Sequence, residues 1–144
     1  MITRKSIFCI MVLALMATTA LAQSAKRLKL SSGLVHTHSL EAATCPKDNN
    51  GKACAQVFIE LPLHGVMVEG DAIMGEVQAV TGGYELYVVS GTKKKKLTIR
   101  HNDFYSLDIP LATAEGDKLV GNESYRVVVE VPVDENAGKT WLTL

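Results

Sequence analysis

The sequence lacks the signatures of the common catalytic classes. It contains no G-x-S-x-G nucleophile elbow, no H-E-x-x-H zinc motif and no phosphate-binding P-loop. Aromatic residues make up only 6% of the chain, and 15 basic residues balance 15 acidic ones. Since nucleic-acid-binding domains normally carry a basic excess, the composition argues against one. At 47% hydrophobic residues the chain is too apolar for a disordered polymer, so we expect a folded protein. Because the catalytic motifs are absent, we expect this protein to be non-catalytic.

The sequence also lacks helical periodicity: we find no long segment whose apolar residues recur with the period of a helix. Short runs instead alternate between apolar and polar residues, which is typical of half-buried strands. These runs lie at 34–41, 56–61, 75–80, 84–90, 96–100, 106–111, 124–131 and 140–144. The pattern predicts an all-β fold, a small antiparallel β-sandwich of about seven strands over residues 34–144.

The first 22 residues have the layout of a secretory signal peptide. Arg4 and Lys5 form a basic start, residues 7–17 form an apolar run, and Ala20-Leu21-Ala22 forms a cleavage site. The apolar run is shorter than the roughly 20 residues needed to span a bilayer, so we expect no stable membrane span after cleavage. An uncleaved membrane anchor is the alternative. The signal predicts an exported protein that is periplasmic, at the cell surface or secreted.

Cleavage after Ala22 changes the charge and the number of cysteines. The remaining chain has 13 basic and 15 acidic residues, and it keeps Cys45 and Cys54 but not Cys9. We expect residues 23–33, which are polar and basic, to form a flexible leader with a short first strand. In an exported protein the two remaining cysteines favour a disulfide, with two separate thiols as the alternative. The Cys-x-x-Cys spacing of redox and zinc sites is absent.

Several stretches together form a layout of turns and strands. They are Gly51-Lys-Ala-Cys-Ala55 before the run 56–61, then Gly82-Gly-Tyr-Glu-Leu-Tyr-Val88, Ser90-Gly-Thr-Lys93, Lys96-Leu-Thr-Ile-Arg-His101 and Asp103-Phe-Tyr105. This layout resembles secreted Bacteroidetes β-domains, and the second half looks like a divergent PEGA-type module. The resemblance implies a small immunoglobulin-like or PEGA-like envelope domain without catalytic residues. The chain departs from the family in lacking Pro-Glu-Gly-Ala, and Asn102-Asp-Phe-Tyr105 replaces the family's Gly-Tyr corner.

One dense cluster of charge consists of Lys93, Lys94, Lys95 and Lys96 beside a predicted turn. Such a cluster can contact an anionic polysaccharide, a lipid headgroup or the acidic face of a partner. Lysines next to a turn also keep exposed strands from pairing edge to edge. The cluster is therefore a candidate binding surface whose alternative is a solvated hairpin end.

Aromatic side chains are the candidates for a sugar-stacking platform, and we single out Tyr87 and Trp141. Tyr84 and Tyr87 must point to opposite faces of a regular strand, so they cannot form one platform together. The alternative for these rings, and for Phe104 and Tyr105, is packing in the core and at its corners.

Metal and cofactor sites are not predicted. His36 and His38 would share a strand face, but zinc needs further ligands, and we expect surface histidines. His64 and His101 match no ligand spacing. Asp48-Asn-Asn-Gly51 begins like a calcium loop but lacks the later ligands of one, so a plain turn is expected.

These observations favour a non-catalytic, exported module of the cell envelope with a structural or surface-binding role. Its expected partner is an envelope protein or an anionic or glycan surface polymer, and not a nucleic acid. The alternative is a carbohydrate-binding accessory module of a glycan-utilisation system.

Overall fold

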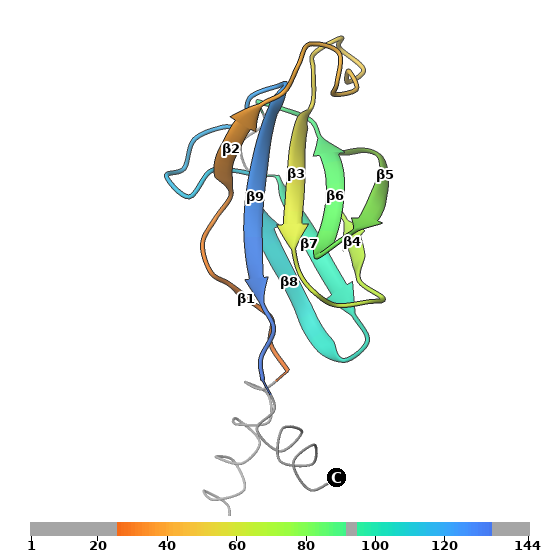
Figure 1. Cartoon of the computed structure of the whole chain (residues 1–144), viewed down its shortest axis with the longest axis vertical. Coiled ribbons are helices and arrows are strands. Elements are labelled where there is room, and N and C mark those ends of the chain that lie inside the picture. Colours follow the sequence, from red (N-terminus) through yellow and green to blue (C-terminus); the bar gives the residue numbers. More distant parts are fainter. Residues whose placement is uncertain (1–25, 92–94, 134–144) are drawn as a thin grey trace, which may run out of the picture. The chain divides into compact units, whose positions relative to one another are not determined.

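A computed structural model describes residues 26–91 and 95–133, which form nine strands and no helix (Figure 1). Leu28–Val131 form one compact unit. The strands are β1 (Lys29–Leu30), β2 (Val35–Ser39), β3 (Ala55–Glu60), β4 (Met67–Glu69), β5 (Ile73–Val80), β6 (Gly83–Val88), β7 (Lys96–His101), β8 (Phe104–Pro110) and β9 (Glu123–Glu130). The predicted all-β class is confirmed.

The strands form two sheets that pack face to face as a β-sandwich (Figure 1). The larger sheet has the order β1-β9-β3-β6-β5, and β2 also pairs with β9. The smaller sheet has the order β4-β7-β8. The named strand pairs are antiparallel except for β3 and β9, which run parallel.

The core lies between the two sheets and follows the alternation of the sequence. Val57 and Ile59 of β3 are completely buried, as are Leu97 and Ile99 of β7. Burial of each such side chain contributes roughly 1.5–3 kcal/mol to folding. The alternation predicted for these runs is therefore confirmed, and that of β9 is too, since Tyr125, Val127 and Val129 are buried there.

The structure has more strands than the sequence pattern predicts. The three-residue β4 was missed because it is too short to show an alternation and because Met67 is 59% exposed. The short first strand expected in the leader is β1, which pairs with β9, and Leu28 beside it is buried. The predicted strand at 140–144 lies outside the described residues.

A tight turn and a close approach between β6 and β3 explain the Gly82-Gly83 pair. Gly82 has a φ of 82° and makes the turn between β5 and β6. A Cβ atom on Gly83 would collide with the carbonyl oxygen of Ile59 on the neighbouring strand β3. Only glycine allows β6 to pair with β3 at this point.

The loops gather at the two ends of the sandwich. Both ends of the compact unit meet where Lys29 pairs with Glu130, at the lower end in Figure 1. The β7–β8 turn lies in the same lower part, whereas the cysteine-containing loop between β2 and β3 is at the upper end. The sandwich therefore offers two separate loop surfaces to a partner.

Candidate functional site

A groove of about 460 Å³ lies between the start of β4 and the β7–β8 hairpin. Its lining combines apolar and polar side chains: Gly65, Met67, Arg100, His101, Asn102, Phe104, Tyr105 and Ser106. Met67 and Tyr105, which are 59% and 49% exposed, are two of the few large hydrophobic residues that the described surface displays. The groove size falls within the roughly 300–1,000 Å³ of small-molecule sites.

The pairing of β4 with β7 builds this groove. Met67 lies opposite Arg100 in the antiparallel register, and the hairpin then turns at Asn102 and Asp103 to bring in Phe104. A register shift near the turn pairs His101 with Phe104, and their rings stack tilted at 5.3 Å between centroids. The groove thus joins residues that are more than thirty positions apart in sequence.

His101 fixes one wall of the groove through both of its ring nitrogens. The backbone N–H of Asp103 donates to Nδ1 at 3.1 Å, so Nδ1 is an acceptor without a proton. The proton of the neutral ring is then on Nε2, which donates to the carbonyl oxygen of His64 at 2.9 Å. His101 therefore ties the loop before β4 to the β7–β8 turn, which holds the groove in shape.

Arg100 contributes the only guanidinium of the groove lining, and it is paired. Its Nε donates to Oε2 of Glu69 at 2.8 Å, and both side chains are largely exposed. Exposed pairs of this kind add at most about 1 kcal/mol of stability, so the pair matters more for charge than for folding. Glu69 offsets the positive charge that Arg100 brings to the groove.

A second cavity, of about 370 Å³, lies at the other end of the small sheet and contains part of the lysine cluster. It is lined by Glu69, Gly70, Asp71, Lys95, Lys96 and Thr98. Lys96 donates from Nζ to Asp108 at 3.0 Å, and Thr98 donates to the same carboxylate at 2.9 Å. These two hydrogen bonds, the Lys96 bond foremost, lower the pKa of Asp108. The described lysines therefore lie among acidic groups, while Lys93 and Lys94 are outside the described residues.

Tyr87, the predicted stacking residue, lies on the outer face of the large sheet. It is half-buried, whereas Tyr84 points into the core and is 8% exposed, as the alternation predicts. Tyr87 lies opposite Gln56 on one side and Met74 on the other, in the large sheet, whereas the β7–β8 turn belongs to the small sheet. It does not line the groove, and Trp141 lies outside the described residues.

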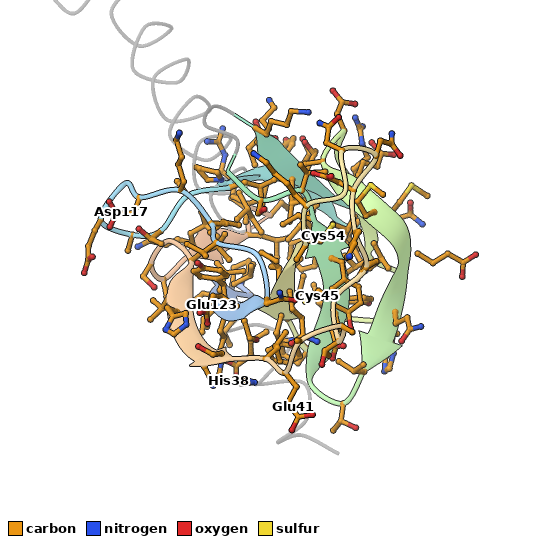
Figure 2. All side chains as sticks on the ribbon, turned by 90° about the horizontal axis from the view of Figure 1, so that it is seen from above. His38, Glu41, Cys45, Cys54, Asp117 and Glu123 are labelled. Atoms are coloured by element: carbon orange, nitrogen blue, oxygen red, sulfur yellow. The ribbon has the colours of Figure 1, made fainter. Side chains whose placement is uncertain are left out.

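The two cysteines are buried, close to one another and free (Figure 2). The predicted disulfide is therefore absent from the structure. Cys54 donates its backbone N–H to the carbonyl oxygen of Pro46 at 2.9 Å, so the end of the loop is held beside Cys45 by a hydrogen bond and not by a covalent one. Burial raises the pKa of both thiols, and for Cys54 the charges of Asp48 and Cys45 add to the effect.

The other polar residues of interest hold the chain in place. Oδ1 of Asp48 accepts hydrogen bonds from the backbone of Asn50 and Lys52, which is the expected plain turn. His36 donates from Nε2 to Glu123 at 2.8 Å across the β2–β9 pair. Figure 2 shows Glu123 on the same side of the upper end as His38.

Among residues 26–91 and 95–133, no group of three or more histidine, cysteine or acidic side chains is placed to hold a metal ion. No helix of these described residues is long and apolar enough to cross a membrane.

Comparison with known proteins returned no matching family model, no similar curated protein and no similar solved structure. The PEGA-type resemblance therefore stays a prediction.

The sequence reasoning missed the groove. Its one local signal was the Asn102-Asp-Phe-Tyr105 corner, which placed two aromatic residues beside a turn. The contribution of Met67 and Arg100 could not be read from the sequence, because it depends on the register between β4 and β7.

Proposed function

We propose that the protein is a non-catalytic, exported module of the cell envelope that works by binding a surface component. The signal-peptide layout of residues 1–22 supports export. The observation that carries the binding role is the groove at the β7–β8 turn, where exposed Met67 and Tyr105 meet a paired arginine. Exposed apolar groups gathered with a few polar groups are typical of ligand sites.

The chemistry around the two cavities supports binding in preference to proton transfer. Glu69 is bonded to Arg100, and Asp108 is bonded to Lys96 and Thr98. A carboxylate whose pKa is lowered, as that of Asp108 is, stays ionised and is a weak base. These side chains are therefore poorly suited to general acid or base catalysis.

The groove is a better binding surface than the described part of the lysine cluster. Around Lys95 and Lys96 the cavity also contains Glu69 and Asp71, so an anionic polymer would meet acidic groups there. A second candidate function, a carbohydrate-binding accessory module, is favoured by the placement of Phe104 and Tyr105 in the groove. If the protein is such a carbohydrate-binding module, the sugar would contact the aromatic residues of the groove and not Tyr87.

Export is tested by fractionating host cells that make the full chain and measuring its mass. We expect the protein outside the cytoplasm with Gln23 as its first residue. Full-length protein in the cytoplasm would contradict the proposal.

Binding is tested by co-sedimentation of the chain, as its host processes it, with isolated envelope fragments. Met67→Ala and Tyr105→Ala should lower the bound fraction, whereas Val120→Ala and Tyr87→Ala should leave it unchanged. Val120 is a matched control because it is 57% exposed outside the groove. Salt-sensitive binding that is lost when Lys93–Lys96 are replaced by glutamine, with Met67→Ala unaffected, would move the site to the lysine cluster.

A further inference from the structure

The groove at the β7–β8 turn has the chemistry of a sugar site. Phe104, Tyr105 and Met67 offer apolar surface, and aromatic rings attract C–H groups to their electron-rich faces. Asn102 and Ser106 offer an amide and a hydroxyl, and within the described residues neither side chain makes a hydrogen bond to the protein. Apolar faces beside free hydrogen-bonding groups suit a ring that has a C–H face and a rim of hydroxyl groups.

The charges of the groove select an uncharged occupant. The lining includes no aspartate or glutamate, and its one guanidinium, on Arg100, is already balanced by Glu69 at 2.8 Å. The Nε atom of Arg100 is used by that pair, but its other N–H groups remain as donors to hydroxyl oxygens. An acidic ligand would meet an arginine whose charge Glu69 already offsets, and a basic ligand would find no carboxylate in the lining.

The walls of the groove are held before any ligand arrives. His101 connects the hairpin to His64 and to Asp103, and its ring packs against Phe104. A site whose side chains are already ordered binds more tightly, because less conformational entropy is lost on binding.

We propose that this groove binds a neutral pyranose unit of an envelope or surface glycan, with Tyr105 and Met67 against the sugar ring and Arg100, Asn102 and Ser106 at its hydroxyl groups. The inference rests on the proposed binding function and names its ligand class. The groove, at about 460 Å³, has room for a short stretch of such a glycan.

The test is competition for the envelope co-sedimentation by soluble neutral hexasaccharides of glucose, mannose, xylose and galactose, with oligogalacturonate as the acidic comparator. We expect at least one neutral hexasaccharide to release the chain, and oligogalacturonate to require a concentration at least about tenfold higher. Direct titration of that hexasaccharide should show a loss of affinity of at least about tenfold for Tyr105→Ala and for Asn102→Ala, as for central binding residues elsewhere. Tyr87→Ala and Val120→Ala should keep the affinity of the unaltered chain.

The outcomes separate the ligand class from the binding role. If Met67→Ala lowers co-sedimentation but no neutral hexasaccharide competes, the sugar inference is overturned and the proposed function stands. Release by protease treatment of the envelope fragments, without competition by sugars, would show a protein partner and also overturn it. If neither Met67→Ala nor Tyr105→Ala changes co-sedimentation, the groove is not the binding surface and both proposals fail.

Discussion

Nε2 of His101 donates a hydrogen bond to the carbonyl oxygen of His64 at 2.9 Å, and this bond joins the loop before β4 to the β7–β8 hairpin. The same ring accepts a hydrogen bond from the backbone of Asp103. We expect His101→Ala to weaken binding in the groove and to lower the free energy of unfolding by about 1–2 kcal/mol, because two hydrogen bonds are lost. Urea unfolding and co-sedimentation measure the two effects. Full binding by the variant would show that the groove does not depend on this connection.

Gly83→Ala should be strongly destabilising. The added Cβ would collide with the carbonyl oxygen of Ile59, so β6 would have to move away from β3. We expect the free energy of unfolding to fall by more than about 2 kcal/mol in urea titrations. Gly116→Ala is the comparison, since Gly116 has a positive φ, which Gly83 lacks, but has open space around it, and it should lose only about 1 kcal/mol. Equal effects of the two substitutions would disprove the close approach.

Tyr125→Phe should remove one partly buried hydrogen bond without emptying the core. The Tyr125 hydroxyl oxygen accepts a hydrogen bond from the backbone N–H of Val120 at 2.9 Å. Without it this donor is left unsatisfied, which should destabilise the fold by about 1–2 kcal/mol. Tyr87→Phe, at the half-buried ring on the outer face, should change the stability by less than about 0.5 kcal/mol. Thermal unfolding of both variants tests the difference.

Acid should weaken the attachment of β2 to β9. Hydrogen bonds from Ser39 and His36, in that order, lower the pKa of Glu123. A lowered folded-state pKa stabilises the fold above the pKa of the unfolded chain, and this contribution is lost as the pH falls through the folded value. We therefore expect the thermal midpoint to drop between about pH 5 and pH 3, and to drop less in Glu123→Gln. An identical drop in the variant would show that Glu123 contributes nothing to acid sensitivity.

The two buried thiols should react slowly in the folded chain. Burial raises the pKa of Cys45 and of Cys54, so little thiolate is present near neutral pH and reagents reach it poorly. In protein purified under reducing conditions, labelling with a thiol reagent should be at least about tenfold faster in urea than in buffer. Rapid labelling of the native chain would contradict the buried placement. In protein taken directly from the host, the absence of any thiol after unfolding would restore the disulfide predicted from the sequence.

The residue pattern predicts which face of a strand is buried better than it predicts which residues of different strands lie side by side. The alternation around Val57 and Ile59 reveals which face of β3 is buried, because burial on one side of a sheet imposes a period of two. No such rule applies to β4, whose three residues owe their position to pairing with β7. Ion pairs between strands are equally hard to predict from the sequence, since the partner of Lys96 is Asp108 on the next strand.

The candidate site shows most clearly that the sequence does not reveal which exposed residues share a surface. Aromatic residues could be counted in the sequence, and Tyr87 was singled out with Trp141 as a candidate for stacking on a sugar. The structure places Tyr87 on an outer sheet face, and it is Tyr105, at the end of the other sheet, that meets Met67 in a groove. Which exposed residues share a surface is decided by the register between strands, and neither composition nor spacing reports it.

The most direct test of the binding groove is a map of backbone amide chemical shifts in the isotope-labelled chain as solubilised envelope fragments are added. We predict that the largest changes fall on Gly65–Met67 and on Arg100–Ser106. Changes confined to Asp71, Lys95 and Lys96, or to the outer face around Tyr87, would contradict the groove as the binding surface.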